Sequence, residues 1–181
     1  MAHGVLYKLP TLMAEKGQKR GSISISRGRL QMPKIIVAPR FSIRGEMKND
    51  GYLELLFEPM DKSSPSERIT FDVTIVRGNM DMFKQYAAGL QVEADDMAVA
   101  KDIPFPAASA FANILHLSHI GARAETIFGV LSFTDWADAA RKAKKEDSNA
   151  EVNSVDVVTV FSTIALQKKL LMELIVTLKA T

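Results

Sequence analysis

The stretch Ile69–Val76 constrains the fold most, because its apolar and polar residues alternate and then stop at the turn sequence Arg77-Gly78-Asn79. A period of two predicts a β-strand with one buried face and one face in water. Asn79 is a residue type that caps helices, and Asp81 would lie favourably in a first helical turn. The sequence therefore predicts a strand that leads through a short turn into a helix.

Two helices are expected after this strand. The first is predicted by apolar residues at helical spacing, which are Met80, Phe83, Ala87 and Leu90. The prolines in Ile103-Pro104-Phe105-Pro106 cannot continue a helix, but Pro106 is well placed to begin one. A second helix is expected from Pro106 to Gly121, with an apolar stripe of Phe111, Ile114 and Leu115.

Shorter alternating or β-branched runs surround this unit. Those before it are Ser22–Ser26, Ile35–Ala38, Phe41–Ile43 and Tyr52–Phe57, and those after it are Thr126–Phe133, Val155–Ile164 and Leu170–Leu178. Pro33 and Pro39 restrict the runs around them to a sheet edge or to irregular extended structure, because proline lacks the N–H that an inner strand needs. The last two runs, joined through Gln167-Lys168-Lys169, are expected to form a terminal hairpin.

One more helix is predicted from Thr134, a capping residue type. Acidic residues occupy its first turn and basic residues its last, as the helix dipole favours: Asp135, Asp138, Lys142, Lys144 and Lys145. The polar stretch Glu146–Ser154 is expected to be a loop. Strands outnumber helices without regular βαβ alternation, so the predicted class is α+β, a mainly antiparallel sheet packed with two or three helices.

The 181 residues suit one domain rather than two. Residues 1–30 contain scattered glycines and little hydrophobic periodicity, so a flexible basic arm is expected there. Residues 31–181 are expected to form a single α+β domain.

The charge is divided unevenly along the chain. Residues 1–48 contain ten Lys or Arg and two Glu, whereas residues 49–181 contain thirteen basic and nineteen acidic residues. Such an arm is expected to contact phosphate, in nucleic acid or in lipid headgroups; the alternative is a solvated tail without specific contacts. The residues predicted to contact phosphate are Lys8, Lys16, Lys19, Arg20, Arg27, Arg29, Lys34, Arg40 and Arg44.

An apolar patch interrupts the arm. Its residues are Val5, Leu6, Tyr7, Leu9 and Pro10. A free arm gains little by exposing such groups, so we expect a neighbouring subunit to bury them in a self-association contact. Burial at a membrane interface, or against the patch's own domain, are the alternatives.

Patterns for catalysis or metal binding are sparse. The chain has no cysteine, which excludes disulfides and thiolate chemistry, and it lacks phosphate-binding-loop, dinucleotide and nucleophile-elbow motifs. His116 with His119, and Asp95-Asp96 with Glu93, are the candidate clusters, and ordinary surface positions are the preferred interpretation of both. We expect no enzyme, no metal and no cofactor. No apolar run is long enough to span a membrane, so any membrane contact is expected to be peripheral.

The order of features in the central part resembles the matrix proteins of rhabdoviruses, particularly the small ones of plant-infecting members. The matching segments are Phe71–Asn79, which ends in Val-Arg-x-Asn, then Tyr86-Ala87-Ala88, Lys101–Phe105, Ile114–Leu117 and the closing segment Met172–Leu178. A basic arm ahead of a compact α+β domain also agrees with that plan. The Pro-Pro-x-Tyr and Pro-Thr-Ala-Pro budding signals of many animal-virus relatives are absent, which puts recruitment of the host's budding machinery in doubt.

The resemblance implies a structural virion protein that condenses the viral nucleocapsid and lines the inner face of the envelope. Its partners would be other copies of itself, the nucleocapsid and an anionic membrane surface, with non-specific RNA binding as an addition. Its location would be the virion, the host cytoplasm and, in some cases, the nucleus. The alternative class is a nucleic-acid-coating capsid or nucleocapsid subunit, or an RNA-binding regulator.

Overall fold

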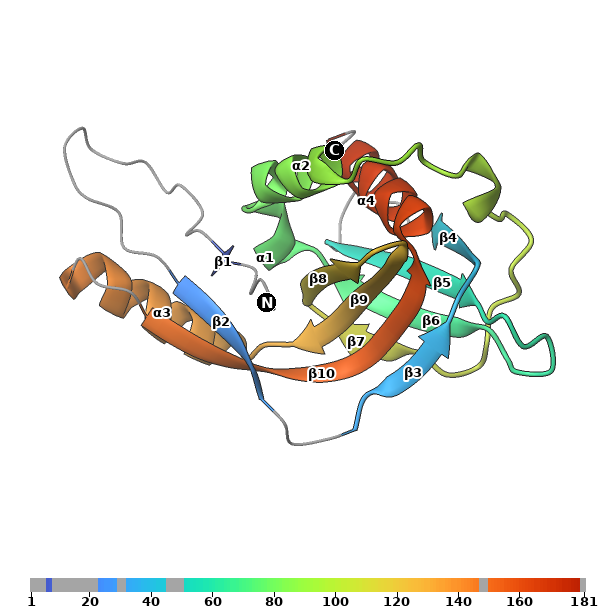
Figure 1. Cartoon of the computed structure of the whole chain (residues 1–181). Helices are drawn as coiled ribbons and strands as arrows, with labels where there is room; N and C mark the ends of the chain where they lie inside the picture. The colour runs from blue at the N-terminus through green and yellow to red at the C-terminus, as the bar shows by residue number, and fades with distance from the viewer. Residues whose placement is uncertain (1–5, 8–22, 29–31, 45–50, 147–149, 180–181) are drawn as a thin grey trace.

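The computed structural model describes residues 6–7, 23–28, 32–44, 51–146 and 150–179, which form two sheets and four α-helices (Figure 1). The first sheet has the order β1 (Leu6–Tyr7), β2 (Ile23–Gly28), β10 (Ala150–Thr163), β9 (Arg123–Val130) and β8 (Ile114–Ile120), and β3 (Lys34–Val37) also pairs with β10. The second sheet has the order β4 (Arg40–Arg44), β5 (Tyr52–Glu58), β6 (Glu67–Asp72) and β7 (Ala110–Ala112).

Strand β10 holds the first sheet together. It pairs antiparallel with β9 along one edge, while β2 and then β3 pair with it in parallel along the other. Figure 1 shows this strand curving through the whole sheet. Segments near the N-terminus therefore depend on a strand near the C-terminus for their backbone hydrogen bonds.

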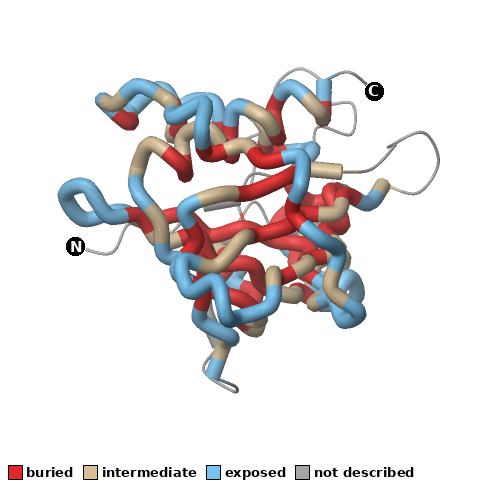
Figure 2. The backbone as a smooth tube through the Cα atoms, turned by 90° about the vertical axis from the view of Figure 1, so that its right-hand side faces the viewer, coloured by how far each residue is buried: buried red, intermediate tan, exposed pale blue. Residues whose placement is uncertain are grey.

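The core lies where the two sheets face each other. Phe128 of β9 is fully buried and packs against two rings of the second sheet, with centroid distances of 5.6 Å to Phe57 and 5.7 Å to Phe71. Figure 2 shows buried backbone through this interior and exposed loops around it. Tilted and edge-to-face aromatic pairs of this kind add stabilisation beyond their burial.

The helices are α1 (Thr74–Arg77), α2 (Met80–Gly89), α3 (Phe133–Glu146) and α4 (Ile164–Lys179), with a single 3₁₀ turn, η1 (Asp96–Ala98). Helices α2 and α4 lie side by side at one end of the molecule (Figure 1). The Lys168 ammonium donates to the carbonyls of Leu90 (2.8 Å) and Val92 (2.7 Å), just beyond the end of α2. A cation at this place suits the negative end of the helix dipole.

The class predicted from the sequence, α+β, is confirmed. Helices α2 and α3 are also confirmed, as are the strands that became β2, β3, β4 and β5 and the hairpin between β5 and β6. At the start of α3 the hydrogen bond to the Asp135 N–H (3.3 Å) is accepted by the Ser132 hydroxyl rather than by Thr134.

The alternating stretch Ile69–Val76 is a strand only as far as Asp72. The Asp72 carboxylate accepts a hydrogen bond from the Thr74 N–H (2.8 Å) and so begins the short helix α1. Ile75 and Val76 are both buried. Neighbouring residues can both be buried in one turn of a helix, whereas neighbours in a strand point to opposite faces. The alternation predicted the burial but not the conformation.

The helix predicted from Pro106 to Gly121 is wrong, because this segment forms β7 and β8. Residues 114–117 are all buried, a pattern that a strand covered on both faces produces as well as a helix does. Gly121 has a φ of 58° and makes the turn from β8 to β9 instead of ending a helix.

The predicted terminal hairpin is wrong in its second strand, whereas its first strand, Val155–Ile164, lies in β10 as far as Thr163. Leu170–Leu178 belongs to helix α4, whose first turn is capped by the Thr163 hydroxyl, which accepts from the Leu166 N–H (3.1 Å). The buried residues of this helix recur at helical spacing: Leu166, Gln167, Leu170, Leu171, Leu174, Ile175 and Leu178. The loop predicted for Glu146–Ser154 is wrong from Ala150 onward, where β10 begins.

Candidate interaction surface

An exposed apolar strip lies along β3 and its neighbours. Ile35 is 65% exposed, Val37 47%, Met60 65% and Phe161 38%. Val37 is the register partner of Phe161 on β10, so these two side chains share one face of the sheet. We call the strand Lys34–Val37 together with Met60 and Phe161 the β3 edge.

In the part of the chain that the structure describes, β3 pairs with one other strand, β10. On the β10 side, the N–H of Ala38 donates to the Phe161 carbonyl (3.0 Å). On the other side, the Val37 carbonyl accepts from the Met60 N–H (2.7 Å). Since consecutive residues direct their backbone groups to opposite sides of a strand, the groups of Ile35 and Val37 face away from β10.

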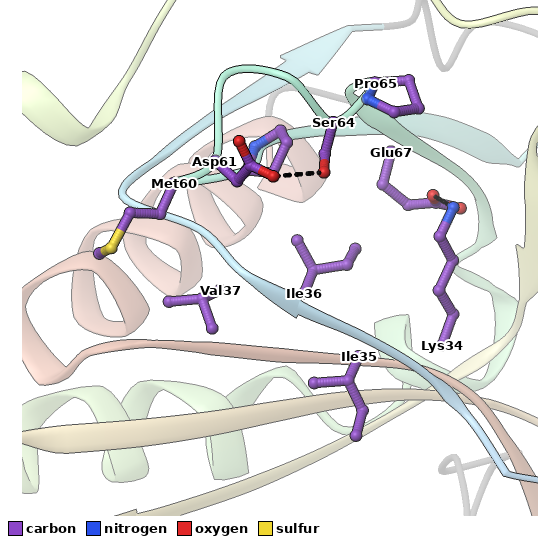
Figure 3. A pocket seen from close by; sticks show the side chains of 10 residues that line it. Lys34, Ile35, Ile36, Val37, Met60, Asp61, Ser64, Pro65 and Glu67 are labelled. Atoms are coloured by element: carbon purple, nitrogen blue, oxygen red, sulfur yellow. Dashed lines mark hydrogen bonds and ion pairs between the residues drawn. The ribbon is translucent and has the colours of Figure 1, made fainter.

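An open-sided pocket of about 570 Å³ lies between β3 and the loop that joins β5 to β6 (Figure 3). It is lined by Lys34, Ile35, Ile36, Val37, Pro59, Met60, Asp61, Ser64, Pro65 and Glu67. In Figure 3 Ile36 points toward the loop, and the Lys34 ammonium meets the Glu67 carboxylate in an ion pair. The pocket is therefore mainly apolar, with the Lys34–Glu67 ion pair at one end and the Asp61 carboxylate on the loop side.

The loop on the far side of this pocket is held in shape by Asp61. Its carboxylate accepts hydrogen bonds from the Ser63 N–H (3.0 Å), the Ser63 hydroxyl (2.7 Å) and the Ser64 hydroxyl (3.1 Å). These bonds to Ser63 and Ser64 hold the pKa of Asp61 below its usual value, because they stabilise the charged form. The loop thus has a turn structure of its own in addition to its bond from Met60 to β3.

The edge of β4, by contrast, is covered. Val99 bridges to Phe41, and the N–H of Ala100 donates to the Phe41 carbonyl (2.8 Å). The guanidinium of Arg44 donates to the carbonyls of Lys101 and Ile103, both at 2.8 Å, and lies 4.5 Å from the centre of the Phe105 ring. These contacts hold the segment 99–105 against the second sheet.

The structure places only some of the predicted phosphate-contacting residues. Lys8, Lys16, Lys19, Arg20 and Arg29 lie outside the described residues, and Arg27 lies on β2 without a described side chain. The other three already have partners in their own chain: Lys34 pairs with Glu67, Arg40 with Glu58 (3.1 Å) and Asp102 (2.9 Å), and Arg44 with the carbonyls above.

The predicted self-association patch is described only in part. Leu6 and Tyr7 form β1, which pairs antiparallel with Ser24 and Ile23 of β2, whereas Val5, Leu9 and Pro10 lie outside the described residues. Strand β2 itself lies within residues 1–30, where we expected a flexible arm, yet it pairs with β10 and buries Ile23 and Ile25. Part of the expected arm is thus a strand of the sheet.

The two histidines do not come together. They lie on strand β8 rather than on a helix, and an odd spacing places them on opposite faces of a strand. His116 is buried and hydrogen-bonded to the Ser154 hydroxyl (3.1 Å), while His119 contacts the Tyr86 hydroxyl (3.0 Å). Among the described residues, no group of three or more acidic or histidine side chains is placed to hold a metal ion.

The acidic cluster is likewise part of the fold. Asp95 caps η1 by accepting from the Met97 N–H (2.9 Å), and Asp96 forms an ion pair with Lys169 of α4 (2.7 Å). Tyr86 links α2 to α4 by donating to the Gln167 side chain (3.1 Å), and burial raises the pKa of Tyr86 to about 12. These groups join elements to one another.

Sequence reasoning placed β3 at a sheet edge but missed the surface that it forms. The signal was present in Pro33 and Pro39, which bound a strand with Ile35 and Val37 on its exposed face. Met60 could not have been foreseen, because a long-range contact brings it to β3.

Comparison of the chain with protein-family models, curated proteins and solved structures found no significant match. None of the helices in the described ranges is both long and apolar enough to cross a bilayer.

Proposed function

We propose that the protein is a self-associating structural protein that binds an anionic surface, as a viral matrix protein binds between the nucleocapsid and the inner face of the envelope. The observation that carries the proposal is the β3 edge, an exposed apolar surface whose strand, Lys34–Val37, lies within the basic residues 1–48. A contiguous apolar surface of this kind is typical of a contact between proteins.

We assign the binding of the anionic surface to basic residues other than those with a described partner in their own chain. Lys34, Arg40 and Arg44 are engaged with groups of their own chain. The candidates that remain from the sequence are Lys8, Lys16, Lys19, Arg20, Arg27 and Arg29. Each basic residue near an anionic membrane contributes about 1 kcal/mol, so a few of them are enough for reversible peripheral binding.

The resemblance to rhabdovirus matrix proteins supports this proposal over an RNA-coating protein, because it accounts for the basic arm and the compact α+β domain together. On this proposal the protein acts on the inner face of a virion envelope and meets the nucleocapsid there. RNA supplies the same phosphate chemistry as lipid headgroups, so the experiment includes both.

The test is flotation of the full chain with vesicles of phosphatidylcholine alone and with added phosphatidylserine, at low and high salt. We expect binding only to the anionic vesicles, with loss of binding at high salt, because the ions screen the charges. Replacing Lys16, Lys19 and Arg20 together by Gln should weaken binding on the order of a hundredfold, at about 1 kcal/mol for each charge.

The matched control removes the same number of charges from the body of the protein. Lys62, Lys101 and Arg123 are exposed, and their joint replacement by Gln should leave vesicle binding nearly unchanged. Equal losses in the two triple variants would refute a role for the arm. Tight binding of single-stranded RNA without binding to anionic vesicles would favour the nucleic-acid-coating class instead.

A further inference from the structure

The loop between β5 and β6 has an exposed serine directly in front of a proline. Every residue of this loop from Asp61 to Pro65 is exposed. Pro65 is the only one of the seven prolines in the sequence that follows a serine or a threonine. Proline-directed protein kinases accept a serine when the next residue is a proline, which has no backbone N–H. Ser64 is therefore the one position of the sequence that such kinases can recognise.

The backbone around Ser64 is also suited to modification. The Ser64 N–H donates to the Asp61 carbonyl (3.0 Å) and closes a turn. A residue before proline favours an extended conformation, because the proline ring clashes with the helical one. The pairing of β5 with β6 ends at Phe57 and Glu67. Ser64 thus lies outside both strands, and a kinase can bind it without breaking their pairing.

The Ser64 hydroxyl lies where a phosphate group would meet a negative charge. It donates a hydrogen bond to the Asp61 carboxylate (3.1 Å; Figure 3). The charged side chains that line the pocket at this place are Lys34, Asp61 and Glu67, and Lys34 already forms an ion pair with Glu67. A phosphate on Ser64 adds a charge of about −1.5 to −2 and removes the donated hydrogen. The attraction between Ser64 and Asp61 would become a repulsion.

We propose that Ser64 is a phosphorylation site for a proline-directed protein kinase, and that its phosphorylation releases the β5–β6 loop from β3. The Ser64 Oγ attacks the γ-phosphorus of Mg²⁺-bound ATP, and an Oγ–P bond forms. The bond from the γ-phosphorus to the oxygen that bridges it to the β-phosphorus breaks, and ADP leaves with the electron pair. The hydroxyl proton passes to a base of the kinase and from there to water.

The repulsion reaches β3 through the backbone. The Asp61 carboxylate is held by the Ser63 N–H (3.0 Å) and the Ser63 hydroxyl (2.7 Å), so it cannot turn away from the phosphate without losing these bonds. The backbone of Asp61 must therefore move. The residue before it, Met60, donates the N–H that bonds to the Val37 carbonyl (2.7 Å). A displacement of Asp61 weakens this bond first.

A consequence for assembly rests on the proposed function. Met60 belongs to the β3 edge, which is the surface proposed for contact between proteins. Phosphorylation places negative charge in the loop beside this edge and displaces Met60 from it. The phosphorylated chain should therefore self-associate less than the unmodified chain.

The first test is labelling of the full chain by a mitogen-activated protein kinase with radioactive ATP. We expect phosphate on Ser64, located by mass spectrometry of the peptides. Ser64→Ala and Pro65→Ala should abolish the labelling. The matched control is Ser63→Ala, because Ser63 is also exposed and also donates to Asp61 but is not followed by proline. This control should be labelled like the wild type. A wild-type chain that takes up no label, or equal labelling of Ser64→Ala, overturns the site.

Hydrogen exchange tests the release of the loop. Exchange at the Met60 N–H should become roughly five- to tenfold faster in the phosphorylated chain, the factor typical of one hydrogen bond. Exchange at the Ala38 N–H, which is bonded to the Phe161 carbonyl of β10, should not change. Ser64→Ala removes the hydroxyl without adding charge, so it should have a smaller effect at Met60. Unchanged exchange at Met60 after phosphorylation overturns the release.

Sedimentation before and after phosphorylation separates this proposal from the proposed function. A chain that self-associates but takes up no label at Ser64 refutes the phosphorylation site alone. A chain that is labelled at Ser64 but is monomeric before labelling refutes the proposed self-association alone. Self-association that is the same before and after complete phosphorylation overturns the consequence for assembly.

Discussion

Strands β3 and β4 follow one another across Ala38 and Pro39, yet their outer edges differ completely. The edge of β4 is closed by the segment 99–105, which Arg40 and Arg44 hold through an ion pair and two carbonyl contacts. The edge of β3 keeps the apolar side chains of Ile35 and Val37 exposed, and its outward Val37 carbonyl accepts a hydrogen bond from the Met60 N–H. Arg40 and Arg44 of the N-terminal region therefore act within the fold, where they hold a segment that follows them by about sixty residues.

The largest expected effect on stability comes from weakening the contact between the two sheets that carry these edges. Phe128→Ala removes a fully buried ring that packs on both Phe57 and Phe71. Loss of a buried phenyl ring costs about 3–5 kcal/mol, which chemical denaturation would measure. Both sheet edges depend on this core, so both should be destabilised together. A decrease in the free energy of unfolding of less than about 1 kcal/mol would show that the Phe128 ring does not hold the two sheets together.

A smaller effect is expected from Arg44→Ala, and it should be limited to the segment 99–105 that covers the edge of β4. Arg44→Ala removes two charge-assisted hydrogen bonds and the contact with Phe105, and such bonds contribute about 1.5–3 kcal/mol together. Hydrogen exchange at the Ala100 N–H should become faster, whereas exchange at Ala38, which is bonded to β10, should not change. Arg44→Lys should recover little, because an ammonium lacks the planar fork that reaches both carbonyls. Unchanged protection of Ala100 in Arg44→Ala would show that the arginine does not hold the segment.

The smallest effect depends on pH. The hydrogen bond and ion pair with Lys169 hold the pKa of Asp96 below its usual 3.8. Because the folded state lowers this pKa, the pair contributes fully above 3.8 and its contribution is lost as the pH falls through the lowered value. Asp96→Asn should therefore lower exchange protection of the Met97 and Ala98 N–H groups at neutral pH. The difference from the wild type should vanish in acid, and a difference that persisted there would exclude the carboxylate as its cause.

Local signals in the sequence predicted much of the first half of the chain. The strand Tyr52–Phe57 was found because the turn Asn49-Asp50-Gly51 precedes it and Pro59 follows it, and it became β5. The helix after Asn79 was found from its apolar spacing, although the Asn79 side chain bonds back to the Ile75 carbonyl (3.0 Å) rather than capping it.

The errors fall in runs where nearly every residue is apolar. Ile114–Leu117 and Leu170–Leu178 are nearly continuous apolar runs, and periodicity cannot separate a buried strand from a buried helix in such runs. The first became a strand and the second a helix, so the two predictions failed in opposite directions. The interaction surface was only partly predictable, because Met60 and Phe161 reach β3 through pairings far apart in the sequence.

The parallel pairing of β3 with β10 also sets the order of events during synthesis. Lys34 pairs in register with Val158, so this contact must wait until the last quarter of the chain has been made. At a translation rate of about 5–20 residues per second, that delay is on the order of ten seconds. Until then Ile35, Ile36 and Val37 of the nascent segment lack the strand that they pair with in the folded protein.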